Sequence, residues 1–311
     1  MGYRVVLTDQ VFPSVDTERE LLATIDATLE VASGERAQIL QAAAGADAIL
    51  TTYYPLDRAF IEGLERCRVI ARYGIGVDNI DLAAAAERGI VVTNVPDYCI
   101  EEVGAHTVAL VLALLRRVPA GAAIVAAGGW GIEGVRPIRR LSTLVLGLVG
   151  TGRIGRWVAG ALGPLVAEVL AYDPFLSEPP PGTRLVELDE LLARSDVVSL
   201  HCPLTEATRG LIGTDELARM KRSAVLVNTS RGPLVQFGAL RAALEAGEIA
   251  GAALDVFETE PPTLPSPAVP NLLATPHMAF YSEEALAESQ VKAATQVVKV
   301  LSGEPPDYPV R

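Results

Sequence analysis

The sequence predicts an α/β protein built from two doubly wound parallel sheets. Short apolar runs alternate with helix-like stretches along almost the whole chain, which is typical of a parallel sheet with helices between its strands. The run at 144–149 carries no polar side chain, as expected of a strand that is buried on both faces. The chain has 311 residues, half of them hydrophobic, which suits about two domains with substantial cores.

The first 95 residues form one complete α/β unit in this reading. Its clearest strands are expected at 5–8, 48–51, 69–71 and 91–93. Its helices are expected at 35–44, 57–64 and 82–88. Since this unit is complete in itself, a second sheet is expected to begin later in the chain.

The second half repeats the alternation after a long helix predicted at 101–117 and a glycine-rich, irregular segment at 120–140. Its strands are expected at 144–149, 166–171, 197–200, 224–228, 251–254 and 272–274. Its helices are expected at 156–165, 188–194, 214–220, 238–246 and 282–301.

A glycine turn, Gly150-Thr151-Gly152-Arg153-Ile154-Gly155, directly follows the strand at 144–149. Gly150 permits a tight turn, Gly152 lets a pyrophosphate approach the backbone, and Gly155 lets the helix pack closely on the strand. The N–H groups and the dipole at a helix N-terminus favour phosphate. The strand, turn and helix context therefore predicts a dinucleotide site.

Asp173 lies eighteen residues after Gly155, at the end of the next predicted strand. An acid at this place accepts hydrogen bonds from the adenosine ribose hydroxyls. A carboxylate also repels a 2′-phosphate, so the sequence favours NAD over NADP.

Polar residues gather just after the predicted strands, at Asp173, His201, Arg231, Asp255 and His277. In open α/β sheets, ligands bind outside the carboxyl ends of the strands. Polar residues at strand ends are common, but an arginine, an acid and a histidine together indicate a site.

The composition bears on which partners, cellular location and metals the protein can have. The net charge of −12 disfavours nucleic acid, and no apolar run reaches the length of a membrane span. The chain starts on a predicted strand rather than a signal peptide, and its cysteines, Cys67, Cys99 and Cys202, have no disulfide or metal spacing. We therefore expect a cytoplasmic protein with no bound metal.

Seven segments in order resemble the D-2-hydroxyacid dehydrogenases. They are residues 72–81 (RYGIGVDNID), 93–96 (TNVP), 147–155, 201–205 (HCPLT), 228–232 (NTSRG), 253–261 (ALDVFETEP) and 275–277 (TPH). The stretch 277–283 is similar to the branch that holds phosphoglycerate dehydrogenases and the C-terminal-binding-protein corepressors, although the corepressors carry tryptophan at the position of Phe280.

The resemblance implies a Rossmann NAD-binding domain, residues 98–284, inserted into a flavodoxin-like substrate domain, residues 1–97 and 285–311. It also implies a homodimer built largely through the nucleotide-binding domains. Because the chain ends just after its closing helix, no appended regulatory domain is expected.

The reaction implied is hydride transfer between NAD and C2 of a 2-oxo or D-2-hydroxy acid. Arg231 would bind the substrate carboxylate with its planar guanidinium. His277 would act as acid and base, and Glu260 would orient the imidazole and favour its charged form.

The resemblance carries further contacts onto this chain. The cofactor contacts are Ile75, Thr107, Gly150, Gly152, Arg153, Ile154, Gly155, Asp173, His201, Pro203, Thr208, Thr229, Ser230 and Asp255. The substrate contacts are Tyr53, Phe280, Arg231 and the backbone N–H groups of Gly74, Ile75 and Gly76. Asp255 would lie at the nicotinamide carboxamide, although its alternative role is to cap the loop that follows it.

One departure concerns Gln236, which stands where the family usually has an aspartate, so the capping of the next helix is in doubt. Tyr53, Tyr54 and Phe280 favour a substrate of some bulk, and Arg72 is the evident cation of the substrate loop. We therefore expect poor activity with phosphohydroxypyruvate.

Two alternatives remain open from the sequence. The first is an NADH-sensing, corepressor-like binding protein with little turnover. The second is a dehydrogenase of an inorganic or one-carbon acid, which the aromatic residues oppose.

Overall fold

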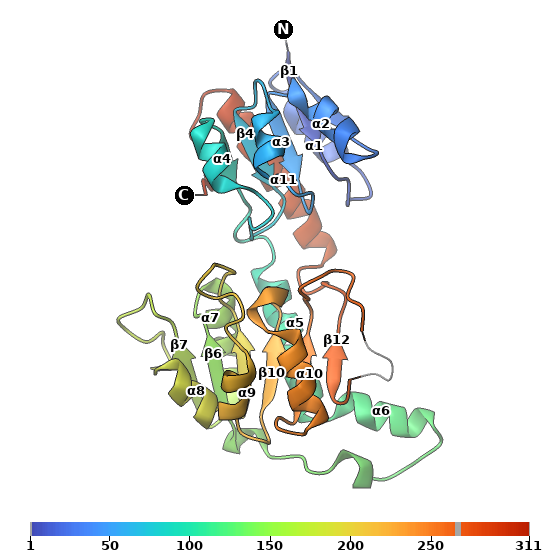
Figure 1. Ribbon diagram of the computed structural model, residues 1–311, viewed down its shortest axis with the longest axis vertical. Helices are drawn as coiled ribbons and strands as arrows, with labels where there is room; N and C mark the ends of the chain where they lie inside the picture. Colours follow the sequence, from blue (N-terminus) through green and yellow to red (C-terminus); the bar gives the residue numbers. More distant parts are fainter. Residues whose placement is uncertain (1, 265–268, 311) are drawn as a thin grey trace. The chain divides into compact units, whose positions relative to one another are not determined.

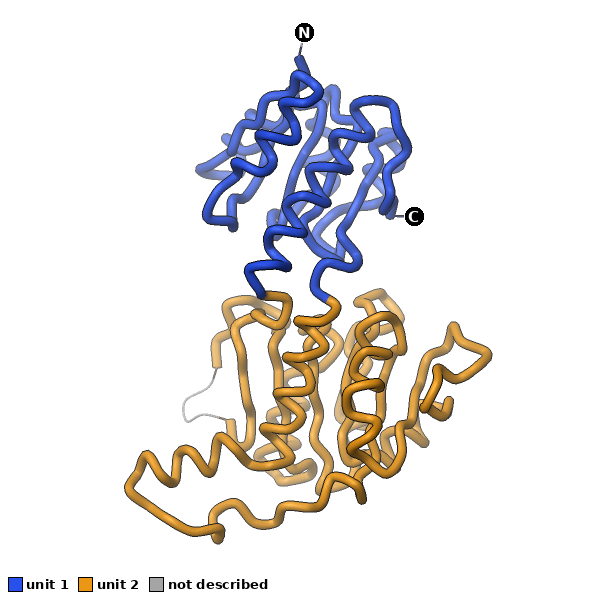
Figure 2. Tube along the Cα trace, turned by 180° about the vertical axis from the view of Figure 1, so that it is seen from behind, with its two compact units in different colours: residues 1–99, 282–311 blue, residues 100–281 orange. Residues whose placement is uncertain are grey.

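The computed structural model describes residues 2–264 and 269–310. The chain divides into two compact units, which Figure 2 shows in different colours. Unit 1 consists of Met1–Cys99 and Ser282–Arg311, and unit 2 is Ile100–Tyr281. These boundaries lie within three residues of the ranges expected from the sequence.

Unit 1 contains one five-stranded parallel sheet in the order β2-β1-β3-β4-β5. The strands are β1 (Tyr3–Leu7), β2 (Ala27–Val31), β3 (Ala48–Thr51), β4 (Val69–Arg72) and β5 (Val91–Thr93). The helices are α1 (Asp16–Ala23), α2 (Arg36–Ala44), α3 (Arg58–Glu62), α4 (Leu82–Glu87) and α11 (Glu283–Leu301). The strand order is that of flavodoxin-like domains and reverses between β1 and β3.

Both faces of this sheet are covered. One apolar cluster packs α1 and α11 against residues such as Leu7 and Leu50, and a second packs α2, α3 and α4 against Val6 and Ile49. Neighbouring residues of one strand thus face opposite cores, which explains why the strands read as continuous apolar runs.

Unit 2 contains a seven-stranded parallel sheet in the order β12-β11-β10-β9-β6-β7-β8. The strands are β6 (Val145–Val149), β7 (Glu168–Tyr172), β8 (Arg184–Leu185), β9 (Val197–Leu200), β10 (Val225–Asn228), β11 (Gly251–Leu254) and β12 (Leu272–Ala274). The α-helices are α5 (Ile100–Leu115), α6 (Val118–Ala126), α7 (Arg153–Leu162), α8 (Leu188–Arg194), α9 (Thr214–Arg219) and α10 (Phe237–Glu245).

The two faces of this sheet again have separate cores. Residues of α5 and α7 pack on one face, and residues of α8, α9 and α10 pack on the other (Figure 1). The strand order reverses between β6 and β9, as in the Rossmann arrangement, so the expected fold class is confirmed.

Several expected elements need correction. The sequence reading missed α1 and β2, and the helix expected at 156–165 begins three residues earlier, at Arg153. The segment 120–140, expected to be irregular, begins inside α6. Pro119 lies in the first turn of α6, where proline is tolerated.

Among the described residues, no single helix is long and apolar enough to cross a membrane. The helices α5 and α6 have the length and apolar composition of a membrane span only when they are taken together. They are bent by 62° at the break between them.

Candidate functional site

The glycine turn joins β6 to α7, and two of its glycines make close backbone contacts. Gly150 has a φ of +89°, and a Cβ on it would lie 2.8 Å from the backbone of His201. A Cβ on Gly155 would lie 2.4 Å from the carbonyl oxygen of Gly150. Glycine at both places therefore lets α7 start directly on the end of the sheet.

Gly152 differs from these two because a Cβ on it would meet no atom within 4 Å. It is the N-cap residue of α7, and no side chain caps the helix there. A helix N-terminus without a side-chain cap, beside an open position at Gly152, suits a phosphate group.

Asp173 follows β7 and is hydrogen-bonded to the glycine turn. Its Oδ2 accepts hydrogen bonds from the backbone N–H of Thr151 at 3.0 Å and from the Thr151 hydroxyl at 3.1 Å. Its Oδ1 accepts one bond, from the N–H of Phe175 at 3.2 Å. Since a carboxylate oxygen can accept two bonds, Oδ1 keeps capacity for a ribose hydroxyl.

His201 follows β9 and lies beside the glycine turn. Its Nε2 is 2.9 Å from the Ser199 hydroxyl, while its Nδ1 is buried with no partner among the described residues. Burial lowers the pKa of His201 to about 4, so the ring is neutral at pH 7. An unsatisfied buried nitrogen is costly. The open space at Gly152, at a helix N-terminus without a side-chain cap, fits the pyrophosphate of a bound dinucleotide.

Seven further expected cofactor residues lie on unit 2. Arg153 and Ile154 form the first turn of α7, and Pro203 and Thr208 share one turn, in which the Thr208 hydroxyl donates to the Pro203 carbonyl at 2.7 Å. Buried Thr107 and Thr229 hydrogen-bond one another at 2.8 Å, whereas the Ser230 hydroxyl donates to the carbonyl of Leu200.

His277 and Glu260 form a hydrogen-bonded pair after β11 and β12. The Nδ1 of His277 is 2.6 Å from Oε2 of Glu260. The other carboxylate oxygen accepts the N–H of Phe257 at 2.9 Å, so the carboxylate is held on both sides. This bond to Nδ1 leaves Nε2 as the ring nitrogen that can exchange a proton with a substrate.

Burial alone would raise the pKa of Glu260. Hydrogen bonds from His277 and Phe257, with the charges of His277 and Arg231, outweigh burial and lower this pKa below its usual value. Glu260 is therefore ionised at neutral pH, and its carboxylate orients the His277 ring through Nδ1.

Asp255 holds the turn that carries His277. Its carbonyl accepts the His277 N–H at 2.8 Å, and its fully buried carboxylate accepts from the N–H groups of Met278 and Ala279 and from the Thr275 hydroxyl. These bonds hold His277 at a φ of +51°, a conformation that residues other than glycine rarely adopt. The capping role weighed for Asp255 is thus present.

Arg231 lies after β10 and is brought toward the His277 group by Gly232. A Cβ on Gly232 would lie 1.9 Å from the carbonyl carbon of Phe257, so the two loops run in backbone contact. The carbonyl of Arg231 accepts a hydrogen bond from the side-chain amide of Asn228. The guanidinium Nη1 of Arg231 donates to the Ser230 carbonyl at 2.7 Å. Phe280 contacts the imidazole of His277 edge-on, with ring centres 5.9 Å apart.

The polar residues that follow the strands of unit 2 therefore form two groups. Asp173 and His201 surround the glycine turn, and Arg231, Asp255 and His277 lie after β10, β11 and β12. The doubt about Gln236 was justified, because it is the N-cap residue of α10 and its side chain makes no capping bond.

The expected substrate residues of unit 1 lie in two loops after β3 and β4. Gly74, Ile75 and Gly76 follow β4, and Tyr53 follows β3 with 48% of its surface exposed. Tyr54 is more covered and packs its ring against Phe60.

The sequence reading missed Asp9, which organises the loop after β3. Its carboxylate accepts the N–H groups of Thr52, Tyr53 and Tyr54 as well as two threonine hydroxyls. A signal was available, because Asp9 follows the first strand as the other site residues follow theirs.

Comparison with known proteins places this geometry in a family. Residues 108–279 match the sequence model of the D-isomer specific 2-hydroxyacid dehydrogenase, NAD binding domain. A D-3-phosphoglycerate dehydrogenase of Methanocaldococcus jannaschii is 38% identical over 283 residues, which are 89% of this chain and 54% of that protein. The chain thus spans about half the length of this relative.

For one further relative and one solved structure, the match with this chain covers most of both proteins. A glyoxylate reductase of Korarchaeum cryptofilum is 41% identical over 261 residues, which are 81% of this chain and 78% of that protein. The crystal structure of a glyoxylate reductase from Paecilomyes thermophila superimposes with a TM-score of 0.89 at 30% identity, over 99% of this chain and 98% of that one. The chain therefore belongs to the D-isomer specific 2-hydroxyacid dehydrogenase family, and unit 2 contains its NAD-binding domain.

Proposed function

We propose that this protein is an NAD-dependent oxidoreductase that transfers hydride between the nicotinamide and C2 of a D-2-hydroxy acid or 2-oxo acid. The observation that carries the proposal is the pair of His277 and Glu260, 2.6 Å apart within the family's NAD-binding domain. A histidine held by an ionised carboxylate can both donate and accept a proton near neutral pH.

Each side chain of the pair has one task in the proposed reaction. NAD, when bound, supplies or accepts the hydride. His277 gives a proton from Nε2 to the substrate oxygen during reduction and takes it back during oxidation. Glu260 keeps the imidazole oriented and charged before reduction, and Arg231 binds the substrate carboxylate.

The cofactor is proposed to rest on the glycine turn. Gly150, Gly152 and Gly155, with Arg153 and Ile154 on α7, would hold the pyrophosphate, and Asp173 would accept from the adenosine ribose. The remaining proposed contacts are Ile75, Thr107, His201, Pro203, Thr208, Thr229, Ser230 and Asp255. The carboxylate of Asp255 already accepts three bonds from its own loop, so its proposed contribution is chiefly to hold His277.

In unit 1, the backbone N–H groups of Gly74, Ile75 and Gly76 are proposed to bind the substrate carboxylate. Tyr53 and Phe280 are each proposed as a substrate contact. Because these side chains are aromatic, we expect an uncharged or aromatic 2-oxo acid to be preferred over phosphohydroxypyruvate.

A homodimer in the cytoplasm is proposed as the working form. Support for a dimer comes from α6, which has no buried residue, and from the exposed side chains near it: Val118, Val125, Trp130 and Ile132. An apolar surface of this kind favours association with another protein surface, for which a second copy is the simplest partner.

The decisive experiment is a screen of NADH oxidation with hydroxypyruvate, glyoxylate, phosphohydroxypyruvate and phenylpyruvate, repeated with NADPH. We expect turnover with NADH, much weaker turnover with NADPH because of Asp173, and a loss of about 10²–10⁴-fold in His277→Ala with NADH binding retained. NADH binding without turnover of any 2-oxo acid would instead indicate an NADH-sensing binding protein. Equal efficiency with NADPH would contradict the role of Asp173.

A further inference from the structure

The loop after β4 has three consecutive carbonyl groups that are each held by the rest of unit 1. The carbonyl of Tyr73 accepts the hydroxyl of Ser289 at 2.6 Å. The carbonyl of Gly74 accepts the N–H of Val95 at 3.1 Å, and that of Ile75 accepts the side-chain amide of Asn94 at 2.7 Å.

These bonds set the direction of the N–H groups in the same loop. In a planar trans peptide, the carbonyl of one residue points opposite to the N–H of the next residue. Each held carbonyl therefore fixes the direction of the N–H group that follows it, in Gly74, Ile75 and Gly76. None of these N–H groups has an acceptor within the described part of the chain.

The residue before the loop is itself fixed. Tyr73 is 2% exposed, its ring packs edge-on against Phe12, and its hydroxyl donates to the buried carboxylate of Glu18 at 2.9 Å. Its N–H donates to the carbonyl of Thr51 at 3.0 Å. The loop thus starts from a rigid residue, and the carbonyl bonds decide how it continues.

We propose that Asn94 and Ser289 are positioning residues for substrate binding, because they orient the N–H groups of the Gly74–Gly76 loop toward the substrate carboxylate. Neither side chain needs to touch the substrate. Asn94 acts from the segment after β5 and Ser289 acts from α11, so two separate elements hold one binding loop. This inference rests on the proposed function.

The test compares Asn94→Ala and Ser289→Ala with the parent enzyme. Each variant frees one peptide group to rotate, so the KM for the best 2-oxo acid is expected to rise about tenfold, roughly the loss of one hydrogen bond to a charged group. The kcat is expected to stay within about threefold, since the groups that move the proton are elsewhere. Asn94→Asp is expected to raise KM further, because a carboxylate cannot donate to Ile75 and repels the substrate.

A binding measurement separates positioning from turnover. Oxamate presents a carboxylate beside a carbonyl that hydride does not reduce, and its Kd for the NADH complex should rise in step with KM. The matched control is Thr295→Ala, which removes a hydroxyl whose one hydrogen bond among the described residues is to the carbonyl of Val291, within α11. This control should leave KM, kcat and the oxamate Kd unchanged.

The two proposals fail in different ways. No turnover of any 2-oxo acid by the parent would overturn the proposed function. An active parent, with alanine variants that fold and keep the parent KM and oxamate Kd, would overturn the positioning role alone. A fall in kcat at unchanged KM would overturn it as well. If one variant does not fold, the other decides, because the two side chains lie on separate elements.

Discussion

At the scale of single residues, the catalytic proposal depends on how a strained histidine is held. His277 has a φ of +51°, and such a conformation persists only where the surroundings enforce it. Asp255 supplies that enforcement through four hydrogen bonds to residues 275–279. The same loop pairs the ring with Glu260, so conformation and charge are set together.

The pH profile of reduction tests the pair directly. Glu260→Gln keeps the shape of the side chain but removes the negative charge that favours a protonated imidazole. The descending limb of kcat/KM for reduction should therefore move to lower pH, with part of the activity surviving at acid pH. The measurement is kcat/KM between about pH 5 and pH 9 in parent and variant.

Glu258→Gln is the matched control, since it removes the same charge from an exposed side chain two residues away. Its profile should coincide with that of the parent. A descending limb that does not move in Glu260→Gln would mean that Glu260 does not tune the group that titrates.

His201 gives a prediction about acid stability. Its pKa is lowered to about 4 by burial, against about 6.5 in an unfolded chain. Between these values the unfolded chain binds a proton that the folded one refuses, so the free energy of unfolding falls as the pH drops from about 6.5 to about 4. At pH 4.5 the loss due to this group should be about 2–3 kcal/mol.

Urea unfolding at pH 7 and pH 4.5 checks this value in the parent and in His201→Gln. The parent should lose about 2–3 kcal/mol more than the variant, because the other acids titrate in both proteins. Equal losses in the two proteins would show that His201 protonates freely in the folded state.

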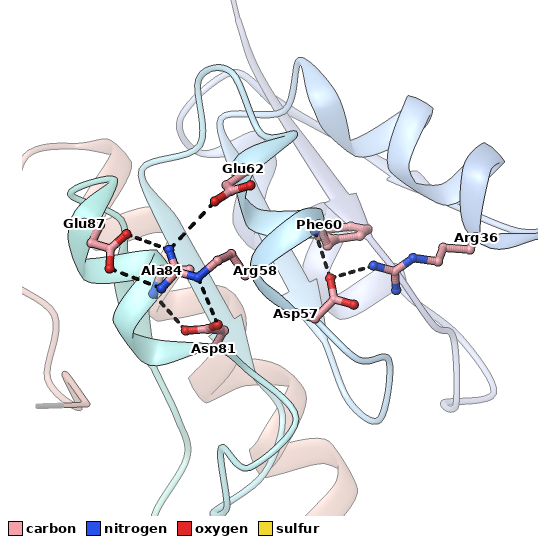
Figure 3. A network of polar contacts seen from close by, with 8 residues as sticks. All are labelled: Arg36, Asp57, Arg58, Phe60, Glu62, Asp81, Ala84 and Glu87. Atoms are coloured by element: carbon pink, nitrogen blue, oxygen red, sulfur yellow. Dashed lines mark hydrogen bonds and ion pairs between the residues drawn. The ribbon is translucent and has the colours of Figure 1, made fainter.

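At the scale of elements, short helices depend on their ends. The helix α4 has six residues, and the carboxylate of Asp81 accepts the N–H of Ala84 at its start, at 2.8 Å. Figure 3 shows Arg58 of α3 reaching Asp81, Glu62 and Glu87, which links the two helices through exposed ion pairs. The cap is expected to matter more than these pairs, since exposed ion pairs contribute little.

Two substitutions at Asp81 separate the cap from the ion pair. Asp81→Ala removes both and should lower the free energy of unfolding by about 1 kcal/mol. Asp81→Asn keeps an oxygen that can accept from Ala84 and should cost much less. Urea unfolding at pH 7 measures both, and an asparagine variant as unstable as the alanine variant would assign the effect to Arg58.

At the scale of the whole molecule, the exposed apolar residues of unit 2 bear on the oligomeric state. Trp130 is 92% exposed, although tryptophan is seldom left in water. Light scattering after gel filtration should give the mass of two chains for the parent and of one chain for Trp130→Asp. Phe175→Asp is the control, because Phe175 is 90% exposed in another loop of unit 2 and should leave the dimer intact. A monomeric parent would contradict the proposed dimer.

The sequence by itself determined the fold class, most strands and the glycine turn. These features depend on local signals: apolar runs of strand length, glycines at fixed spacing and polar residues directly after strands. The family motifs predicted Arg231, Glu260 and His277 as the catalytic group. The start of α6 was not predicted because the segment 120–140 is rich in glycine, and only the assembled backbone shows Pro119 in the first turn of a helix.

Only the tertiary structure decided how the chosen residues are held. The carboxylate of Asp255 accepts hydrogen bonds from the turn that carries His277, and the carboxylate of Asp9 accepts them from the loop that carries Tyr53. The hydroxyl of Ser289 donates to the carbonyl of Tyr73, which lies 216 residues away in the chain. These are side-chain to backbone hydrogen bonds between distant segments, and their donors and acceptors carry no spacing that a sequence pattern can reveal. Every residue has the same carbonyl and nearly every residue the same N–H, so which of them a side chain meets is settled only when the strands and helices are packed.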